Sequence, residues 1–334
     1  MDELLSLLSE TEYISGEALC KTLGITRAAI WKRIEKLREE GYVIEAAGKR
    51  GYRLTPPADS LLPAYLTREL TTRWAGRGEI CYQPSVTSTN TVLKELARAD
   101  APKGSLALCE LQTHGKGRLG RAWDAATGEN LLHSLLLRPA LPIEQAQLCT
   151  LAAALAMAQA IEDTVPVLKA GIKWPNDIVL GGQKCVGILS ELSADMDGIH
   201  FIVMGVGVNV NQRAFSGELT QKATSLWLEQ SRLLGKDAPP IDRRKLLCAY
   251  LSRMEQVMDQ LEKSGLSALL PEYTRRSVTL GAQVRVISAA EEWTGTAEKL
   301  DETGALFVKD ASGELRRVLS GDVSVRGVMG YVES

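Results

Sequence analysis

The chain has 334 residues, of which 45% are hydrophobic and 24% are charged, as in globular proteins with a sizeable core. Its net charge of −2 gives no overall attraction to nucleic acid, so any such binding needs a local positive patch. The six cysteines show no Cys-x-x-Cys spacing, which argues against a disulfide framework or a zinc site and favours a cytoplasmic location. The three histidines lie far apart in the sequence, which argues against a dedicated metal site. The most apolar run, residues 148–161, is too short to span a membrane, and no signal peptide is evident.

Residues 1–60 are predicted to form a winged helix-turn-helix domain with a short linker. The predicted elements are helices at residues 4–8, 16–23 and 27–40 and strands at residues 43–45 and 51–54. Ser15 and Thr26 are suited to cap the second and third helices, and Gly24 ends the second. A basic turn at residues 48–50 joins the two strands, as expected of a wing.

The third predicted helix is expected to enter the major groove of DNA. Its first residues are best placed to meet base edges, and its cations and those of the turn are expected to contact phosphates. The residues assigned to DNA binding are Thr26, Arg27, Ala28, Lys32, Arg33, Lys49 and Arg50. Lys36, Arg38 and Arg53 add positive charge to the same helix and hairpin. The alternative is a winged helix that contacts only protein.

Residues 61–277 are predicted to form an α/β domain. Near its start, Ser88, Thr89 and Asn90 precede a predicted helix at residues 91–99. Such side chains either cap the helix or bind an uncharged polar group, such as a urea or amide. Gln112, at the end of the predicted strand 105–112, can add to such a site.

Residues 115–121 read Gly-Lys-Gly-Arg-Leu-Gly-Arg, with three glycines and three cations. They match the dinucleotide-binding pattern Gly-x-Gly-x-x-Gly, but that pattern requires a helix to follow. Here a second apolar strand is predicted instead, at residues 131–137. The segment is therefore interpreted as a strand-to-strand loop that closes over an anion, with a merely solvated hairpin as the alternative.

A second motif, Lys-Trp-Pro-Asn-Asp at residues 173–177, precedes a strand, a Gly-Gly turn and a returning strand that begins near Lys184. A lysine entering a buried strand either pairs with an anion or extends to water. Asn209 and Asn211 follow the next buried strand on one side, where they can meet a nucleotide or tie down a loop.

The last segment, residues 278–334, contains five short predicted strands. They lie at residues 284–287, 293–300, 306–309, 315–319 and 323–326. A turn signal at residues 301–304 separates two of them. This pattern indicates a small SH3-like β-barrel.

Together these motifs resemble, in order, those of the biotin protein ligase/biotin operon repressor family, over nearly the whole chain. The resemblance implies an α+β protein with a class II synthetase-like central domain that contains a mixed sheet. It implies that biotin and ATP with Mg²⁺ form biotinyl-5′-AMP, and that biotin then passes to a lysine of a biotin carboxyl carrier protein. It also implies operator binding with the adenylate as corepressor, and a homodimer when liganded.

The resemblance carries roles over to individual residues. The catalytic residues would be Lys184 and Arg118. The biotin-binding residues would be Ser88, Thr89, Asn90, Gln112, Lys116, Gly117, Arg118 and Lys184. The ATP-binding residues would be Arg121, Lys173, Asn176, Asn209 and Asn211, and no residue forms a dedicated metal site.

Two residues depart from the arginines that family members often have in the glycine loop, namely Lys116 and Leu119. Lysine keeps the charge but loses the two-pronged hydrogen bonding of arginine. Two alternative functions stay open, a biotin sensor with a degenerate ligase domain and a lipoate-type ligase.

Overall fold

The computed structural model describes residues 3–288, 291–319 and 324–327, and the chain divides into two compact units, Met1–Leu70 and Thr71–Ser334. Within the described ranges, no helix has the length and apolar character needed to cross a membrane. The predicted domain boundaries after residues 60 and 277 stay predictions.

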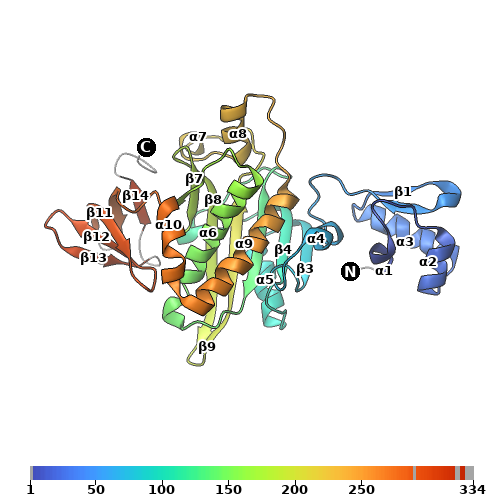
Figure 1. The fold of residues 1–334 in the computed structure, drawn as a ribbon, viewed down its shortest axis with the longest axis horizontal. Coiled ribbons are helices and arrows are strands. Elements are labelled where there is room, and N and C mark those ends of the chain that lie inside the picture. Colours follow the sequence, from blue (N-terminus) through green and yellow to red (C-terminus); the bar gives the residue numbers. More distant parts are fainter. Residues whose placement is uncertain (1–2, 289–290, 320–323, 328–334) are drawn as a thin grey trace. The chain divides into compact units, whose positions relative to one another are not determined.

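The first unit is a helix-turn-helix followed by a β-hairpin wing (Figure 1). Its elements are α1 (Glu3–Leu7), α2 (Gly16–Leu23), α3 (Arg27–Glu39), β1 (Ile44–Ala46), the 3-10 turn η1 (Gly48–Arg50), β2 (Tyr52–Leu54) and α4 (Pro63–Glu69). Both predicted caps are confirmed, because Ser15 Oγ accepts from the backbone N–H of Ala18 and Thr26 Oγ1 from that of Ala29. Gly24 has a φ of 66° and ends α2, as expected for glycine.

α4 packs within this first unit. The hydroxyl of Tyr65 accepts a hydrogen bond from the backbone N–H of Val43 at 3.0 Å. The guanidinium of Arg68 donates to the carbonyl oxygens of Leu5 and Leu8 at 2.7 and 2.8 Å. The unit therefore extends to Leu70, past the linker predicted from the prolines at 56 and 57.

The second unit is built on a mixed sheet of seven strands, in the order β3-β4-β5-β9-β8-β7-β6. The strands are β3 (Ile80–Val86), β4 (Leu106–Gln112), β5 (Leu131–Leu137), β6 (Gly171–Lys173), β7 (Asp177–Leu180), β8 (Gln183–Asp195) and β9 (Gly198–Val208). β3 and β4 are parallel and joined through α5 (Thr89–Arg98), and the other neighbours are antiparallel. β4 therefore leads through the glycine loop into an antiparallel strand, which confirms that this loop does not open a βαβ unit.

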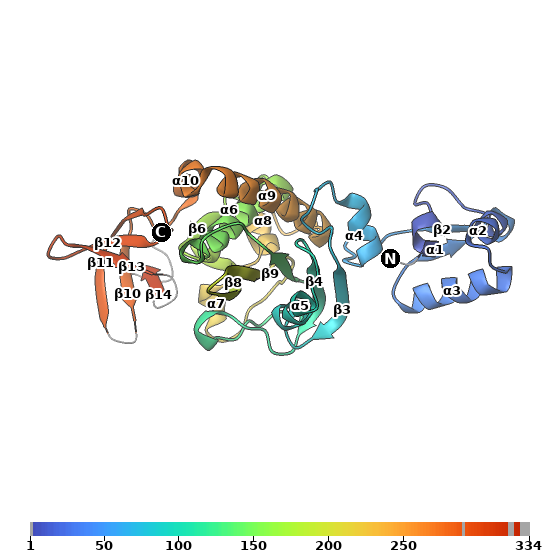
Figure 2. The same ribbon diagram turned by 90° about the horizontal axis from the view of Figure 1, so that it is seen from below.

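Helices cover both faces of this sheet (Figures 1 and 2). α6 (Leu148–Thr164) and α9 (Arg243–Ser264) lie side by side over one face, and α5 covers the other. α6 is rich in alanine and leucine and buries nearly its whole length, so it fills the layer between the sheet and α9. Shorter helices complete the unit: α7 (Leu219–Lys222), α8 (Leu226–Leu234), α10 (Leu270–Arg276), and the 3-10 turns η2 (Arg118–Gly120), η3 (Ile143–Gln145) and η4 (Leu266–Ala268).

The last part of this unit is a five-stranded antiparallel sheet in the order β13-β12-β11-β10-β14. Its strands are β10 (Gln283–Ile287), β11 (Glu292–Leu300), β12 (Leu306–Asp310), β13 (Leu315–Val318) and β14 (Ser324–Gly327). The strand pairings among the described residues leave the sheet open, so the predicted barrel is seen as an unclosed sheet. The predicted start of its last strand, Val323, lies outside the described residues. The indole N–H of Trp174 donates to the carbonyl of Gly304 at 3.1 Å, which links this sheet to the central one.

Candidate active site

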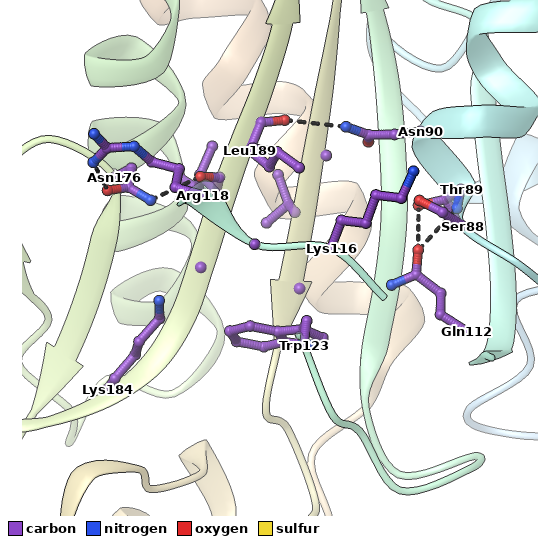
Figure 3. A pocket seen from close by; sticks show the side chains of 16 residues that line it. Ser88, Thr89, Asn90, Gln112, Lys116, Arg118, Trp123, Asn176, Lys184 and Leu189 are labelled. Carbon is purple, nitrogen blue, oxygen red and sulfur yellow. Dashed lines mark hydrogen bonds between the residues drawn. The ribbon is translucent and has the colours of Figure 1, made fainter. Parts of the chain in front are cut away.

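A pocket lies over the carboxyl-terminal ends of β3, β4 and β9 and the first half of β8, beneath the glycine loop (Figure 3). It is lined by Ser88, Thr89, Asn90, Gln112, Lys116, Gly117, Arg118, Trp123, Asn176, Lys184, Gly187, Ile188, Leu189, Gly205, Val206 and Gly207. The structure thus brings together all eight residues predicted to bind biotin, although they span nearly 100 positions of the sequence. One end of the pocket is lined by the hydroxyl and amide side chains of Ser88, Thr89 and Gln112, with Lys116 on the same side, and the other end carries Arg118 and Lys184.

The floor of the pocket depends on glycines in the two central strands. Gly187 of β8 pairs with Gly207 of β9, and the indole of Trp123 lies over both. A Cβ atom at either position would come within 2.6–2.7 Å of the indole ring. Gly205 leaves space for the side chain of Asn90 in the same way, because a Cβ atom at this position would overlap the Asn90 amide. The glycines therefore let Trp123 and Asn90 pack directly on the strands.

The end with hydroxyl and amide side chains is organised around the start of α5. Gln112 Oε1 accepts hydrogen bonds from the backbone N–H of Thr89 at 2.8 Å and from its hydroxyl at 3.2 Å. Ser88 occupies the N-cap position, but its side chain makes no capping hydrogen bond. Sequence reasoning left capping and ligand binding open for these residues, and here Gln112 satisfies the helix N-terminus in place of Ser88.

Asn90 is held from behind by the half-buried Glu191 and the buried Ser134. Its amide nitrogen donates to Glu191 Oε2 at 2.7 Å, and its amide oxygen lies 2.6 Å from the hydroxyl of the fully buried Ser134. Lys94 donates to the other carboxylate oxygen of Glu191 at 2.7 Å. Burial raises the pKa of Glu191, but the hydrogen bonds from Lys94 and Asn90 outweigh it and leave the pKa below its ordinary value. Glu191 is therefore ionised and orients the amide of Asn90.

The glycine loop lies across the pocket. The backbone N–H of Gly117 donates to the carbonyl of Arg121 at 2.7 Å, which closes a tight turn. Within it, Leu119 has a φ of 55° and a 59% exposed side chain, so this residue points away from the pocket in a strained conformation. Figure 3 shows Lys116 on the side of Ser88 and Thr89, and Arg118 directed toward Asn176.

Arg118 is anchored to the Lys-Trp-Pro-Asn-Asp motif. Its guanidinium donates to Asn176 Oδ1 at 2.9 Å, and the Asn176 amide donates to the carbonyl of Ile188 at 2.9 Å. Burial lowers the pKa of Arg118, while the nearby carboxylate of Asp177 raises it. The pocket therefore holds a partly desolvated guanidinium, which attracts an anion more strongly than one in water.

Lys184 enters the other side of the charged end. Its ammonium lies 2.6 Å from Asp177 Oδ1 and 5.4 Å from the centre of the Trp123 ring. Lys173 approaches the second oxygen of Asp177 at 3.9 Å. One carboxylate thus faces two ammonium groups, so the charged end keeps a positive excess for an incoming anion.

Four residues predicted to bind ATP lie outside the lining of the pocket. Arg121 is exposed on the glycine loop, and Lys173 is buried behind Asp177. The amide nitrogen of Asn209 donates to the carbonyl of Thr224, and the amide of Asn211 both donates to and accepts from the backbone of Ile241. Both asparagines thus tie down loops, one of the two roles left open above, and their role toward ATP stays a prediction.

Sequence reasoning missed several residues of the site. The missed side chains are Trp123, Ser134 and Glu191. Trp123 lies in an irregular segment with no periodic pattern, and Ser134 lies within an otherwise apolar strand. The alternation of Gly205 and Gly207 with large apolar residues was the one local signal, since glycines within a strand indicate a close approach by another group.

The residues predicted to bind DNA lie on the first unit. Those of α3 and of the wing, including Arg27, Lys32 and Lys49, are exposed. Two further cations have structural roles instead: Arg38 donates to the carbonyl of Ile44 at 2.5 and 3.1 Å, and Arg53 pairs with a carboxylate of β1. Their charge cannot be counted as free for phosphate contacts.

Comparison with known proteins identifies the family. Residues 82–209 match the model of the biotin/lipoate A/B protein ligase family, residues 1–53 match an HTH domain, and residues 279–326 match the biotin protein ligase C terminal domain. The bifunctional ligase/repressor BirA of Bacillus spizizenii is 34% identical over 97% of this chain and 98% of its own, and that of Escherichia coli is 28% identical over 97% and 96%. A solved biotin protein ligase from Aquifex aeolicus, in complex with biotin and ATP, superposes with a TM-score of 0.62 at 27% identity, covering 75% of this chain and 99% of that one. The chain therefore belongs to the family of bifunctional biotin protein ligases and repressors.

Proposed function

We propose that the protein joins biotin to a lysine of a biotin carboxyl carrier protein at the expense of ATP. In the first step a carboxylate oxygen of biotin attacks the α-phosphorus, the bond to the β-phosphate oxygen breaks, and pyrophosphate leaves. In the second step the lysine amine attacks the acyl carbon of biotinyl-5′-AMP, an amide forms, and AMP and a proton are released. The observation that carries this proposal is one pocket that has hydroxyl and amide side chains at one end and Arg118 and Lys184 at the other.

The end with hydroxyl and amide side chains suits the ring system of biotin. Its ureido group is neutral and offers both donors and acceptors, which the side chains of Ser88, Thr89 and Gln112 can match. Asn90 contributes by shaping this end, because Ser134 and Glu191 hold its amide. Trp123 covers the aliphatic chain that leads from the ring to the carboxylate.

The cationic end suits the reacting groups. Two anions, a carboxylate and a phosphate, must approach each other during adenylation, and fixed positive charge lowers that barrier. Lys184 and Arg118 are proposed to hold the carboxylate and the α-phosphate, and Lys116 is proposed to close over them from the loop. Closure of this loop would also exclude water and limit hydrolysis of the adenylate.

The nucleotide is proposed to extend from this end past Asn176. Arg121, Lys173, Asn209 and Asn211 are proposed to support it from around the pocket. Mg²⁺ is proposed to bind through the ATP phosphates, because the nearest carboxylate, Asp177, already faces two ammonium groups and does not fit a dedicated metal site.

The first unit is proposed to repress transcription when the adenylate is bound. Its helix-turn-helix and basic wing would contact an operator, and a homodimer would match a palindromic operator. The protein is proposed to act in the cytoplasm, because its six free cysteines stay reduced in that compartment.

One pair of proteins tests both halves of the proposal, the full chain and a variant that begins at Thr71. Both are expected to catalyse biotin-dependent exchange between ATP and pyrophosphate, since the pocket lies within the second unit. Only the full chain is expected to bind a specific DNA duplex in the presence of biotin and ATP. Absence of exchange in the full chain would refute the ligase, and specific binding by the shortened chain would refute the assignment of the operator-binding unit.

A further inference from the structure

A large aromatic side chain is exposed on α3. Trp31 has 56% of its surface accessible, whereas Ile30, Ile34 and Leu37 of the same helix are at most 2% exposed and form the core of the unit. An exposed indole leaves apolar surface in contact with water, which is unfavourable compared with burying that surface. Core packing therefore gives no account of a tryptophan at this position.

Trp31 lies among the residues proposed to contact DNA. It follows Arg27 by one turn, and Ala28 and Lys32 flank it on the same side of the helix. All four are exposed, and the helix begins at the Thr26 cap just before them. The partner of Arg27, Glu17, lies 3.6 Å away with both side chains largely in water, so this contact holds the cation weakly.

The wing of the same unit presents a second group of cations in a fixed arrangement. The guanidinium groups of Arg50 and Arg53 both lie 4.7 Å from the centre of the Tyr13 ring, and the hydroxyl of Tyr13 donates to Glu45 at 2.8 Å. Arg53 and Glu45 neutralise each other, so Arg50 and the exposed Lys49 supply the net charge. The surroundings of Trp31 thus favour a polyanion over an apolar protein surface.

We infer that Trp31 reads sequence in the major groove by packing its indole against the C5-methyl group of a thymine. This inference rests on the proposed operator binding and adds the base that is read. In the major groove only thymine presents a methyl group, and apolar side chains discriminate by contact with it. Arg27 and Lys32 hold the helix on the phosphates on either side, while Trp31 supplies the apolar contact.

The test uses the full chain with biotin and ATP, and a duplex selected from a random 30-base-pair library by that protein. Each thymine of the selected duplex is replaced in turn by uracil, which removes only the methyl group. For the wild-type chain, at least one replacement in each half-site is expected to weaken binding about fourfold, as burial of one methyl group predicts. Trp31→Ala is expected to bind the original duplex more weakly and to lose this discrimination, and Trp31→Phe to keep part of it.

Controls separate the inference from the function on which it rests. Trp31→Ala is expected to keep full exchange between ATP and pyrophosphate, which reports on the second unit, and to keep the amide hydrogen-exchange protection of α3, which shows that the first unit is folded. Lys32→Ala is expected to weaken all duplexes alike and to lower the salt dependence of binding, without changing the uracil pattern. If Trp31→Ala shows the same uracil pattern as the wild type, or if it changes only the oligomeric state, the inference is wrong although operator binding stands. If the wild-type chain selects no duplex, the proposed repressor function fails as well.

Discussion

Lys184 reaches Asp177 across the position of Gly187. The ammonium lies 2.6 Å from Asp177 Oδ1, although Asp177 is paired in the sheet with Gly187, three residues beyond Lys184. A Cβ atom at Gly187 would lie 3.1 Å from Lys184 Nζ and 2.7 Å from the Trp123 ring. Because Gly187 has no side chain, the side chain of Lys184 can extend past it into the charged end of the pocket.

Replacement of Lys184 by alanine is expected to lower ATP–pyrophosphate exchange by roughly 100-fold or more. The reason is the loss of a fixed charge where the carboxylate and the α-phosphate meet. Lys263→Ala, which removes an exposed lysine in the last turn of α9, is the matched control and is expected to leave exchange unchanged. Normal exchange in the Lys184 variant would remove this residue from the proposed mechanism.

Gly187→Ala is expected to disturb both Trp123 and Lys184. Overpacking against the rigid indole is expected to reduce the free energy of unfolding by about 1–3 kcal/mol. It is also expected to raise the KM for biotin, because Trp123 must shift within the pocket. Gly16→Ala in α2 is the control, since the nearest atom to its added methyl group lies 3.9 Å away. Urea unfolding and exchange kinetics measure both effects, and an unchanged KM would show that the indole does not contact biotin.

Arg118→Gly and Asn176→Ala test the clamp over the adenylate. Removing the guanidinium is expected to speed release of biotinyl-5′-AMP by roughly tenfold or more, the scale of one charge-assisted hydrogen bond. Asn176→Ala keeps the guanidinium of Arg118 but removes the 2.9 Å hydrogen bond that holds it, so a smaller increase in the release rate is expected. Release is measured by dilution of the preformed complex into excess unlabelled adenylate. Equal release from both variants and the wild type would refute the clamp.

His133 is expected to make the folded state sensitive to acid. It is fully buried beside Tyr250, neither of its ring nitrogens has a hydrogen-bond partner among the described residues, and burial lowers its pKa to about 3. The unfolded chain takes up a proton near pH 6.5 while the folded chain does not. Stability is therefore complete above pH 6.5 and falls as the pH drops below it, by about 1.4 kcal/mol per unit.

Urea unfolding at pH 7 and pH 5.5 measures this effect. His133→Phe, which retains a ring in the same layer, is expected to lose about 1 kcal/mol of the pH-dependent change. Met196→Leu, a change without a titratable group in the exposed β8–β9 turn, is the control and is expected to keep it. A variant at His133 with the pH dependence of the wild type would show that another group is responsible.

Local signals in the sequence were enough to predict the helix-turn-helix and the wing of the first unit, but not α4. The caps at Ser15 and Thr26 and the turn at Gly24 depend only on neighbouring residues, so the helices between them begin and end as predicted. The motif residues of the pocket were predictable for a different reason, because the resemblance to a family supplied the long-range information that residue patterns lack.

The rest of the site depends on the register between distant strands. Gly187 and Gly207 meet only because β8 and β9 pair in one register, and only that meeting makes a floor on which Trp123 can lie. Ser134 reads as one polar residue in an apolar strand until β5 brings it against Asn90. The partners of Arg38 and Arg53 across the wing are likewise visible only in the folded unit.

The proposed activity of this pocket is the activation of biotin for transfer to a carrier lysine. The most direct measurement is mass spectrometry of a biotin carboxyl carrier domain after incubation with the full chain, ATP, and either biotin or lipoate. We expect a mass increase that corresponds to one biotin on a single lysine, and no increase with lipoate. No adduct with biotin would contradict the claim in favour of a sensor without ligase activity, and an adduct with lipoate alone would contradict it in favour of a lipoate ligase.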